Sequence, residues 1–308
     1  MRAAVLYEIG GLPVPSQFAD PPPLEGFETA EVLIAGLNPV DLYIAAGTYG
    51  PVEAPYVVGR EGIARLADDR RVYFEATAPR FGSMAQLAPV DPAYSFTVPD
   101  DLDAGLAVAC GIAGLAAWLP LEWRARLQPG ETVLVLGASG VVGQIGVQAA
   151  KLLDAGRVIA AARSRDVLER LLERGADQIV VLGGADDRQA LRDAAGRHGY
   201  DVILDPVYGA PLEAAMPACA EGARVVSVGS SAGDRATIGF RDLYSRAHYG
   251  HNNRQAPYEV RREAYERLTA HAGAGEIVVD VERIPLEHVA DAWRRQAAGP
   301  HHKLTLVP

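Results

Sequence analysis

The sequence predicts an α/β protein with a doubly wound parallel sheet, and three observations support this fold class. A glycine-rich unit directly follows a short apolar strand near the middle of the chain. Strand-like and helix-like segments then alternate as far as residue 229, which indicates parallel strands joined by crossover helices. The N-terminal third and residues 277–308 hold short strand-like runs instead. We therefore expect the parallel sheet to be inserted between two parts of a β-rich domain.

The N-terminal region contains short runs of strand-forming residues separated by Gly, Pro and Asp. These runs cover 3–7, 30–37, 71–74 and 85–89, and they predict a compact barrel or sandwich. From Ala104 the residues become small and apolar, in the run AGLAVACGIAGLAAWLPL. This composition indicates packed helices that lead into the glycine-rich unit.

The glycine-rich unit consists of a predicted strand, 132–136, followed by Gly137, Gly140 and Gly143 at three-residue spacing. We expect Gly137 to form a sharp turn, Gly140 to let backbone N–H groups approach a pyrophosphate, and Gly143 to pack closely on the strand. The next helix, 142–153, would hold phosphate charge at its N-terminus. Taken alone, the motif is equally consistent with a plain strand-to-helix turn in some other α/β protein.

The second strand of this unit, 157–162, ends without the Asp or Glu that binds the ribose 2′-OH of NAD. Arg163, Ser164 and Arg165 follow it instead. Guanidinium groups and a hydroxyl can bind a 2′-phosphate through charge-assisted hydrogen bonds, so this stretch predicts NADPH rather than NADH. The alternative is that Arg163 and Arg165 are solvated charges at the start of a helix.

The remaining segments continue the alternation and then return to the β-rich part. They are a helix at 165–174, a strand at 178–182, a polar helix to 198, a strand at 202–205, a helix from 211, a strand at 223–229, a helix at 286–298 and a final strand at 304–307. We place the β-rich substrate domain at 1–109 and 251–308, and the dinucleotide-binding domain at 110–250.

Composition excludes several functional classes. The 308 residues carry a net charge of -10 with basic residues scattered among acids, which disfavours nucleic-acid binding. Two cysteines are too few for a disulfide framework or a four-cysteine zinc lobe, and Cys110 lies in an apolar stretch typical of a core. The histidines at 248, 251, 301 and 302 have no Cys or carboxylate at a matching spacing, so no metal site is expected. We expect neither a membrane span nor a signal peptide, and therefore a cytoplasmic protein.

Four motifs outside the glycine-rich unit resemble the medium-chain dehydrogenase/reductase superfamily, and more narrowly its zinc-independent quinone oxidoreductase branch. They are NPVDLY at 38–43, GTY at 47–49, PYVVGREG at 55–62 and LQPGETV at 127–133. The resemblance covers nearly the whole chain and implies a Rossmann-type sheet inserted into a GroES-like substrate domain. AHYGHNNR, at 247–254, departs from the family pattern, and a role for it in substrate choice or cofactor binding stays open.

The sequence departs from the zinc-dependent members of the superfamily at two positions. Asn38 stands where those enzymes have a zinc-binding Cys, and Arg60 stands where they have a zinc-binding His. A catalytic zinc therefore lacks its usual ligands. Without a Lewis acid, hydride transfer to a quinone or an α,β-unsaturated carbonyl is favoured over alcohol oxidation, because such acceptors delocalise the incoming charge.

The resemblance also assigns site residues. It implies that Asn38, Asp41, Tyr43 and Tyr49 line the cleft near the nicotinamide. Our hypothesis is that Tyr43 or Tyr49 donates a hydrogen bond to the substrate oxygen while Asn38 and Asp41 fix the pocket. Asn38 and Asp41 are equally suited to satisfying the backbone of a turn. The expected cofactor residues are Gly137, Ser139, Gly140, Val141, Val142, Gly143, Arg163, Ser164, Arg165, Pro206, Gly229, Ser230 and Lys303.

The function that follows is an NADPH-dependent reductase of quinones or enones, with a small-molecule substrate. Two alternatives remain open: an enoyl or ketone reductase that acts on a biosynthetic intermediate, and a redox-silent NADPH-binding sensor. The resemblance further implies a homodimer formed through the edge strand near 244–249, because an uncovered edge strand is otherwise a liability.

Overall fold

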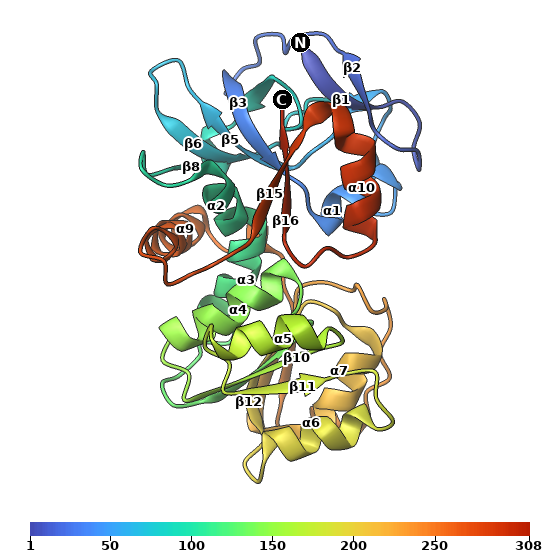
Figure 1. Ribbon diagram of the computed structural model, residues 1–308, viewed down its shortest axis with the longest axis vertical. Helices are drawn as coiled ribbons and strands as arrows, with labels where there is room; N and C mark the ends of the chain where they lie inside the picture. Colours follow the sequence, from blue (N-terminus) through green and yellow to red (C-terminus); the bar gives the residue numbers. More distant parts are fainter. The chain divides into compact units, whose positions relative to one another are not determined.

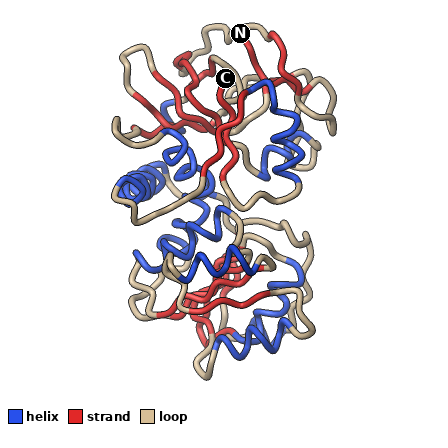
Figure 2. Tube along the Cα trace, in the orientation of Figure 1, coloured by secondary structure: helices blue, strands red, loops and turns tan.

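The computed structural model describes all residues, 1–308, and the chain divides into two compact units. The first unit comprises Met1–Ile112, Tyr265–Gly275 and Val279–Pro308, and the second comprises Ala113–Ala264 and Glu276–Val278. The second unit is thus an insertion in the first, and each unit has its own sheets (Figures 1 and 2).

The second unit is built on a six-stranded parallel sheet with the strand order β11-β10-β9-β12-β13-β14. The strands are β9 (Thr132–Leu136), β10 (Arg157–Ala162), β11 (Gln178–Val181), β12 (Tyr200–Asp205), β13 (Cys219–Ser227) and β14 (Ala247–Gly250). The order reverses between β9 and β12, which is the switch point where doubly wound sheets bind their ligands. The predicted fold class is therefore confirmed.

Helices cover both faces of this sheet. They are α4 (Val141–Leu152), α5 (Arg165–Leu172), α6 (Asp187–Ala195) and α7 (Gly209–Ala215), with a short α8 (Phe240–Leu243) before β14. Leu191 of α6 and Leu212 of α7 pack with Leu134 and Ile203 on one face. On the other face α4 approaches so closely that a Cβ added at Gly146 would lie 2.4 Å from Leu204 Cδ2. Fully buried apolar strands are what a sheet covered on both faces requires.

The first unit contains two sheets of mainly antiparallel strands. The smaller sheet has the order β2-β1-β4, and the larger has the order β15-β16-β3-β5-β6-β8, with β7 paired to β3. Their strands are β1 (Arg2–Leu6), β2 (Val14–Gln17), β3 (Glu28–Gly36), β4 (Tyr56–Val57), β5 (Glu61–Arg65), β6 (Arg71–Glu75), β7 (Leu87–Val90), β8 (Ser95–Thr97), β15 (Val281–Pro285) and β16 (Lys303–Val307). The parallel pair β15 and β16 returns from the end of the chain, as predicted, and β16 pairs with β3.

Two α-helices complete the first unit and a third crosses the boundary between the units. They are α1 (Pro39–Ala45), α10 (Val289–Ala297) and α9 (Tyr258–Gly273), which begins in the second unit and ends in the first. The predicted limit near residue 250 therefore lies too early. Residues after β14 belong to the second unit because His251 packs against Trp123, with ring centroids 6.0 Å apart, and Gln255 accepts a hydrogen bond from Arg124.

The small-residue segment after β8 is an interrupted helix. It consists of α2 (Ala104–Ala109), a wide turn at Cys110–Gly114, α3 (Leu115–Leu119) and a second wide turn at Pro120–Arg124. Contrary to expectation, Ala104–Arg124 is long and apolar enough to cross a membrane, with a mean hydropathy of 1.9. However, 78% of its apolar window is buried inside the protein, so packing accounts for its composition.

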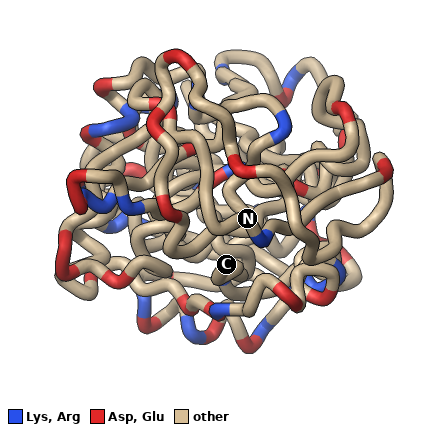
Figure 3. Tube along the Cα trace, turned by 90° about the horizontal axis from the view of Figure 1, so that it is seen from above, with Lys and Arg blue, Asp and Glu red and all other residues tan.

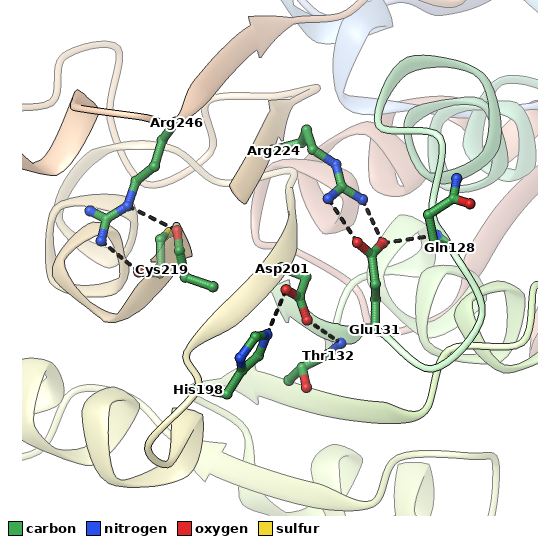
Figure 4. A network of polar contacts seen from close by, with 9 residues as sticks. Gln128, Glu131, Thr132, His198, Asp201, Cys219, Arg224 and Arg246 are labelled. Atoms are coloured by element: carbon green, nitrogen blue, oxygen red, sulfur yellow. Dashed lines mark hydrogen bonds and ion pairs between the residues drawn. The ribbon is translucent and has the colours of Figure 1, made fainter. Parts of the chain in front are cut away.

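Charged side chains fix the amino-terminal edge of the parallel sheet (Figure 4). Arg224 of β13 forms a two-pronged ion pair with Glu131, which also accepts the backbone N–H of Gln128. Asp201 accepts the backbone N–H of Thr132, so it joins β12 to β9. Elsewhere along the visible trace, Lys and Arg are interspersed with Asp and Glu (Figure 3), in keeping with the scattered charges of the sequence.

Candidate functional site

The turn between β9 and α4 has the geometry that the glycine-rich motif predicts. Gly137 has a φ of 57°, a left-handed conformation that favours glycine. A Cβ at Gly143 would lie 2.5 Å from Ala138 Cα, so this glycine is required for helix–strand packing. A Cβ at Gly140 would meet nothing closer than 3.5 Å. The protein itself therefore leaves space at Gly140, which suits the close approach of a ligand.

The N-terminus of α4 is suited to an anion. Gly140 is its N-cap residue, no side chain caps the helix, and no acidic residue lies in its first turn. The N–H groups of Val141, Val142 and Gly143 have no acceptor within the helix, because the first turn of any α-helix leaves its N–H groups unpaired. Together with Ser139 of the turn, these groups fit the pyrophosphate of a dinucleotide.

The residue that directly follows β10 is an arginine without a hydrogen-bond or ion-pair partner. Arg163 follows the last residue of the strand, is exposed, and makes no hydrogen bond or ion pair. Ser164 is the N-cap residue of α5, yet its hydroxyl makes no capping hydrogen bond. Arg165 is different, because its guanidinium lies 3.7 Å from Glu169 in an exposed pair. Arg163 and Ser164 are therefore better placed than Arg165 to receive a phosphate.

The predicted cofactor residues beyond β12 and β13 lie against the same turn. A Cβ added at Gly137 would be 2.3 Å from Val207 Cγ1 and 3.4 Å from Pro206 Cγ. A Cβ added at Gly229 would be 2.6 Å from the carbonyl oxygen of Pro206. The Pro206–Tyr208 turn thus contacts both Gly137 and Gly229, and Ser230 follows Gly229 in an exposed position. The structure brings these three segments together at the switch point of the sheet.

The first unit contains a buried polar cluster centred on Glu61. One carboxylate oxygen accepts hydrogen bonds from Asn38 Nδ2 at 2.8 Å and from Lys303 Nζ at 2.7 Å. The other accepts from the Tyr73 hydroxyl at 3.1 Å and from the backbone N–H of Ile112 at 2.6 Å. Glu61 and Lys303 are 0% and 2% exposed, so this is a buried and fully hydrogen-bonded ion pair.

Lys303 does not have the role that the sequence suggested. Its ammonium group contacts Asn38 Oδ1 at 2.7 Å, Glu61 Oε1 at 2.7 Å and the Leu37 carbonyl at 3.4 Å. Its donors are therefore committed inside the first unit, and the proposed contact with cofactor phosphates does not fit this geometry. The signal that could have found the cluster is a charged residue at the first position of an otherwise largely apolar strand, Glu61 in EGIAR and Lys303 in KLTLV.

Asn38 and Asp41 have different hydrogen-bond partners in the structure. Asp41 Oδ2 accepts the backbone N–H of Asn38 at 2.8 Å and so caps α1. The amide of Asn38 instead connects Glu61 with Lys303. Burial raises the pKa of Asp41 to about 7, and its Oδ1 has no hydrogen-bond partner. Both residues are buried, whereas Tyr43 and Tyr49 are exposed on and just after α1.

The sequence did not bring together a second set of polar groups, in the second unit, although a role was left open for residues 247–254, which include His248. Asp205 ends β12 and is buried, Ser227 ends β13, and His248 lies on β14. Burial raises the pKa of Asp205 and lowers that of His248. The available signal was an aspartate at the end of a buried apolar strand. Cys110, by contrast, is a core residue as predicted, and burial raises the pKa of its thiol to about 12.

Comparisons with known proteins identify the relatives of this chain. The profile of the family described as zinc-binding dehydrogenase matches residues 141–261. The quinone oxidoreductase of Rattus norvegicus is 30% identical over 243 residues, which cover 74% of this chain and 73% of the relative. The quinone oxidoreductase of Homo sapiens is 27% identical over 328 residues, covering 100% of this chain and 98% of the relative. The structure of Escherichia coli quinone oxidoreductase complexed with NADPH has a TM-score of 0.90, at 22% identity and with 100% of both chains covered.

Proposed function

Because the chain belongs to the quinone oxidoreductase branch of the medium-chain dehydrogenase/reductase superfamily, we propose that this oxidoreductase is an NADPH-dependent, zinc-independent reductase of quinones or α,β-unsaturated carbonyls. The observation that carries the choice of cofactor is the free guanidinium of Arg163 beside the free hydroxyl of Ser164. They directly follow Ala162, which occupies the position where a carboxylate would select NADH and repel a 2′-phosphate.

The nucleotide is assigned to the second unit. The first turn of α4 binds the pyrophosphate, Arg163 and Ser164 bind the 2′-phosphate, and the segments at Pro206 and Gly229 form the wall beyond them. When bound, the reduced nicotinamide supplies a hydride to the acceptor. The residues of this chain bind and orient the reactants, and orientation provides much of the rate enhancement.

The substrate oxygen is assigned to the tyrosines of the first unit. Tyr43 and Tyr49 are 40% and 53% exposed, so their hydroxyls can donate a hydrogen bond to a carbonyl oxygen that gains negative charge. Asn38 and Asp41 are buried and hold the polypeptide that carries these tyrosines. Asp41 does so by capping α1, the helix on which Tyr43 lies.

Zinc independence rests on the chemistry of the donor set. Asn38 uses both ends of its amide within the cluster, and both oxygens of Glu61 are hydrogen-bonded. The ammonium of Lys303 already balances the carboxylate of Glu61. Arg60, adjacent to Glu61, would add a further positive charge. This set opposes a divalent cation instead of coordinating one.

A nucleotide titration tests the assignment of the cofactor. We expect Arg163→Ala to raise the dissociation constant of NADPH at least about tenfold while that of NADH changes less than about twofold, since only NADPH carries the 2′-phosphate. Fluorescence of the reduced nicotinamide measures both constants. Arg170→Ala is the matched control, because Arg170 is an exposed arginine of α5 that contacts only the Asp166 carbonyl. Equal loss of both nucleotides in Arg163→Ala would contradict the 2′-phosphate assignment.

An acceptor panel tests the reaction. NADPH oxidation is followed with 1,4-benzoquinone, with conjugated enones and with saturated ketones as the control class. Turnover of the conjugated acceptors alone supports the proposal, and preferential turnover of ketones supports a carbonyl reductase. Tight NADPH binding without turnover of any acceptor would favour a sensor.

A further inference from the structure

Three side chains outside the machinery described so far connect neighbouring strands of the parallel sheet. Ser227 Oγ lies 2.7 Å from Asp205 Oδ2 and 2.9 Å from His248 Nε2. The strand register places Asp205 opposite Ser227 and places His248 opposite Val225, two residues before Ser227 on the same face. The chain of contacts therefore crosses β12, β13 and β14.

The direction of these hydrogen bonds follows from the groups themselves. The Ser227 hydroxyl has one hydrogen and gives it to the carboxylate of Asp205. Its oxygen must then accept the Nε2–H of His248. The imidazole thus holds the hydroxyl in position, and the hydroxyl holds the carboxylate.

The other oxygen of Asp205 holds the Pro206–Tyr208 turn. Asp205 Oδ1 accepts the backbone N–H groups of Val207 at 3.0 Å and Tyr208 at 2.8 Å. Tyr208 has a φ of 57°, a left-handed conformation that is strained for a residue other than glycine and persists only where its surroundings enforce it. The ring of His248 stacks on the ring of Tyr208, with centroids 6.1 Å apart and planes inclined by 25°. The two ends of this chain of contacts, Asp205 and His248, therefore both contact the Pro206–Tyr208 turn.

We propose that His248 is a positioning residue for the nicotinamide nucleotide, acting through Ser227 and Asp205 on the Pro206–Tyr208 turn. The turn touches Gly137 on one side and Gly229 on the other, so a displaced turn changes the shape of the nucleotide site. This inference rests on the proposed function, because it requires that the site binds a nucleotide.

Three substitutions separate the hydrogen bond from the ring contact. His248→Phe keeps a ring against Tyr208 but donates no hydrogen bond, and Ser227→Ala removes the link to Asp205. His248→Gln keeps an N–H that can reach Ser227. His198→Gln is the control, because His198 is an exposed histidine that is hydrogen-bonded to Asp201 in the same unit.

We expect His248→Phe and Ser227→Ala to raise the dissociation constant of NADPH about fivefold, the effect of one lost hydrogen bond. His248→Gln and His198→Gln should remain within about twofold of the wild type. Nucleotide binding is measured by fluorescence, and the unfolding temperature of each variant is recorded in the absence of nucleotide. Rescue by glutamine is the informative result, because a residue that only packs in the core would not be rescued by a flexible amide.

Wild-type binding separates the two proposals. A wild type that binds neither nucleotide overturns the proposed function and this inference together. A wild type that binds NADPH while His248→Phe binds equally well overturns only the inference. Equal weakening in His248→Phe and His248→Gln would also overturn it, since the hydrogen bond would then play no part.

Discussion

Asp41 holds a carboxyl group where water cannot reach it, and this has a consequence for stability. Burial raises its pKa from 3.8 to about 7, with the charge of Glu61 adding to the effect while Lys303 and Arg60 oppose it. Between these pH values the folded protein binds more protons than the unfolded chain. The free energy of unfolding therefore falls as pH rises from about 4 to 7, and this loss is complete above pH 7.

We therefore expect Asp41→Asn to stabilise the protein at alkaline pH. Asparagine keeps an oxygen to accept the backbone N–H of Asn38, but it carries no charge to desolvate. The free energy of unfolding of the variant should exceed that of the wild type by an amount that grows with pH. This difference should be near zero at pH 4 and as much as about 4 kcal/mol above pH 7. Urea unfolding between pH 4.5 and 9 measures the difference.

Asp68→Asn is the control for that series, because Asp68 is an exposed carboxyl whose pKa is lowered by its hydrogen bond to Arg70. This substitution should leave the dependence of stability on pH unchanged above pH 5. If Asp41→Asn and the wild type gave parallel curves instead, Asp41 would be ionised in the folded protein.

At the scale of the element, Gly140 and Gly143 of the β9–α4 turn have different roles although they are only three residues apart. Gly143→Ala would place a Cβ 2.5 Å from both Ala138 Cα and the Gly137 carbonyl oxygen, which are backbone atoms that cannot move freely. We expect it to lower the free energy of unfolding by about 1–3 kcal/mol. Gly140 has φ -79° and ψ 164°, which alanine adopts readily, and there is space for its methyl group.

Gly140→Ala should accordingly fold with a stability within about 0.5 kcal/mol of the wild type. Its methyl group would obstruct the pyrophosphate, so the dissociation constant of NADPH should rise at least about tenfold. Chemical denaturation and nucleotide titration of both variants check this contrast. If Gly140→Ala bound NADPH as the wild type does, the pyrophosphate would not approach this turn.

The strands of the parallel sheet could be predicted closely because their signals are local. The bounds of β9 and β10 are those expected from sequence, since each is a short buried apolar run ended by a turn. The polar clusters could not be predicted in this way. Lys303 meets Glu61 across 242 residues of sequence, and Ser227 meets His248 only because β14 returns beside β13. No local pattern encodes such pairs.

At the scale of the whole molecule, packing determines where along the sequence one unit ends and the other begins. Composition does not indicate this limit. Residues 251–264 follow the last strand of the parallel sheet and carry no sequence signal that assigns them to either unit. Trp123, Arg124 and the second wide turn of the interrupted helix hold them in the second unit. The same is true of Glu276–Val278, where Val278 exchanges two hydrogen bonds with the side-chain amide of Gln148 on α4.

The exposed edge of the parallel sheet leads to a prediction about assembly. β14 pairs only with β13, so its outer backbone groups are open to another strand. Phe240 and Tyr244, just before it, are 79% and 69% exposed, and their rings contact each other at 6.2 Å. An uncovered strand beside exposed aromatic side chains favours association with a second copy of the chain.

We therefore predict a homodimer, whose mass by light scattering at micromolar concentration should be twice the 32.7 kDa of the monomer. Replacing both Phe240 and Tyr244 with glutamate should shift the equilibrium toward the monomer, because each dimer would then place like charges at the interface. Because both side chains are exposed, this double variant should still fold. Phe18→Glu, at an aromatic contact in the first unit, is not expected to change the mass of the assembly. A wild type of monomer mass would show that the edge strand is left uncovered in solution.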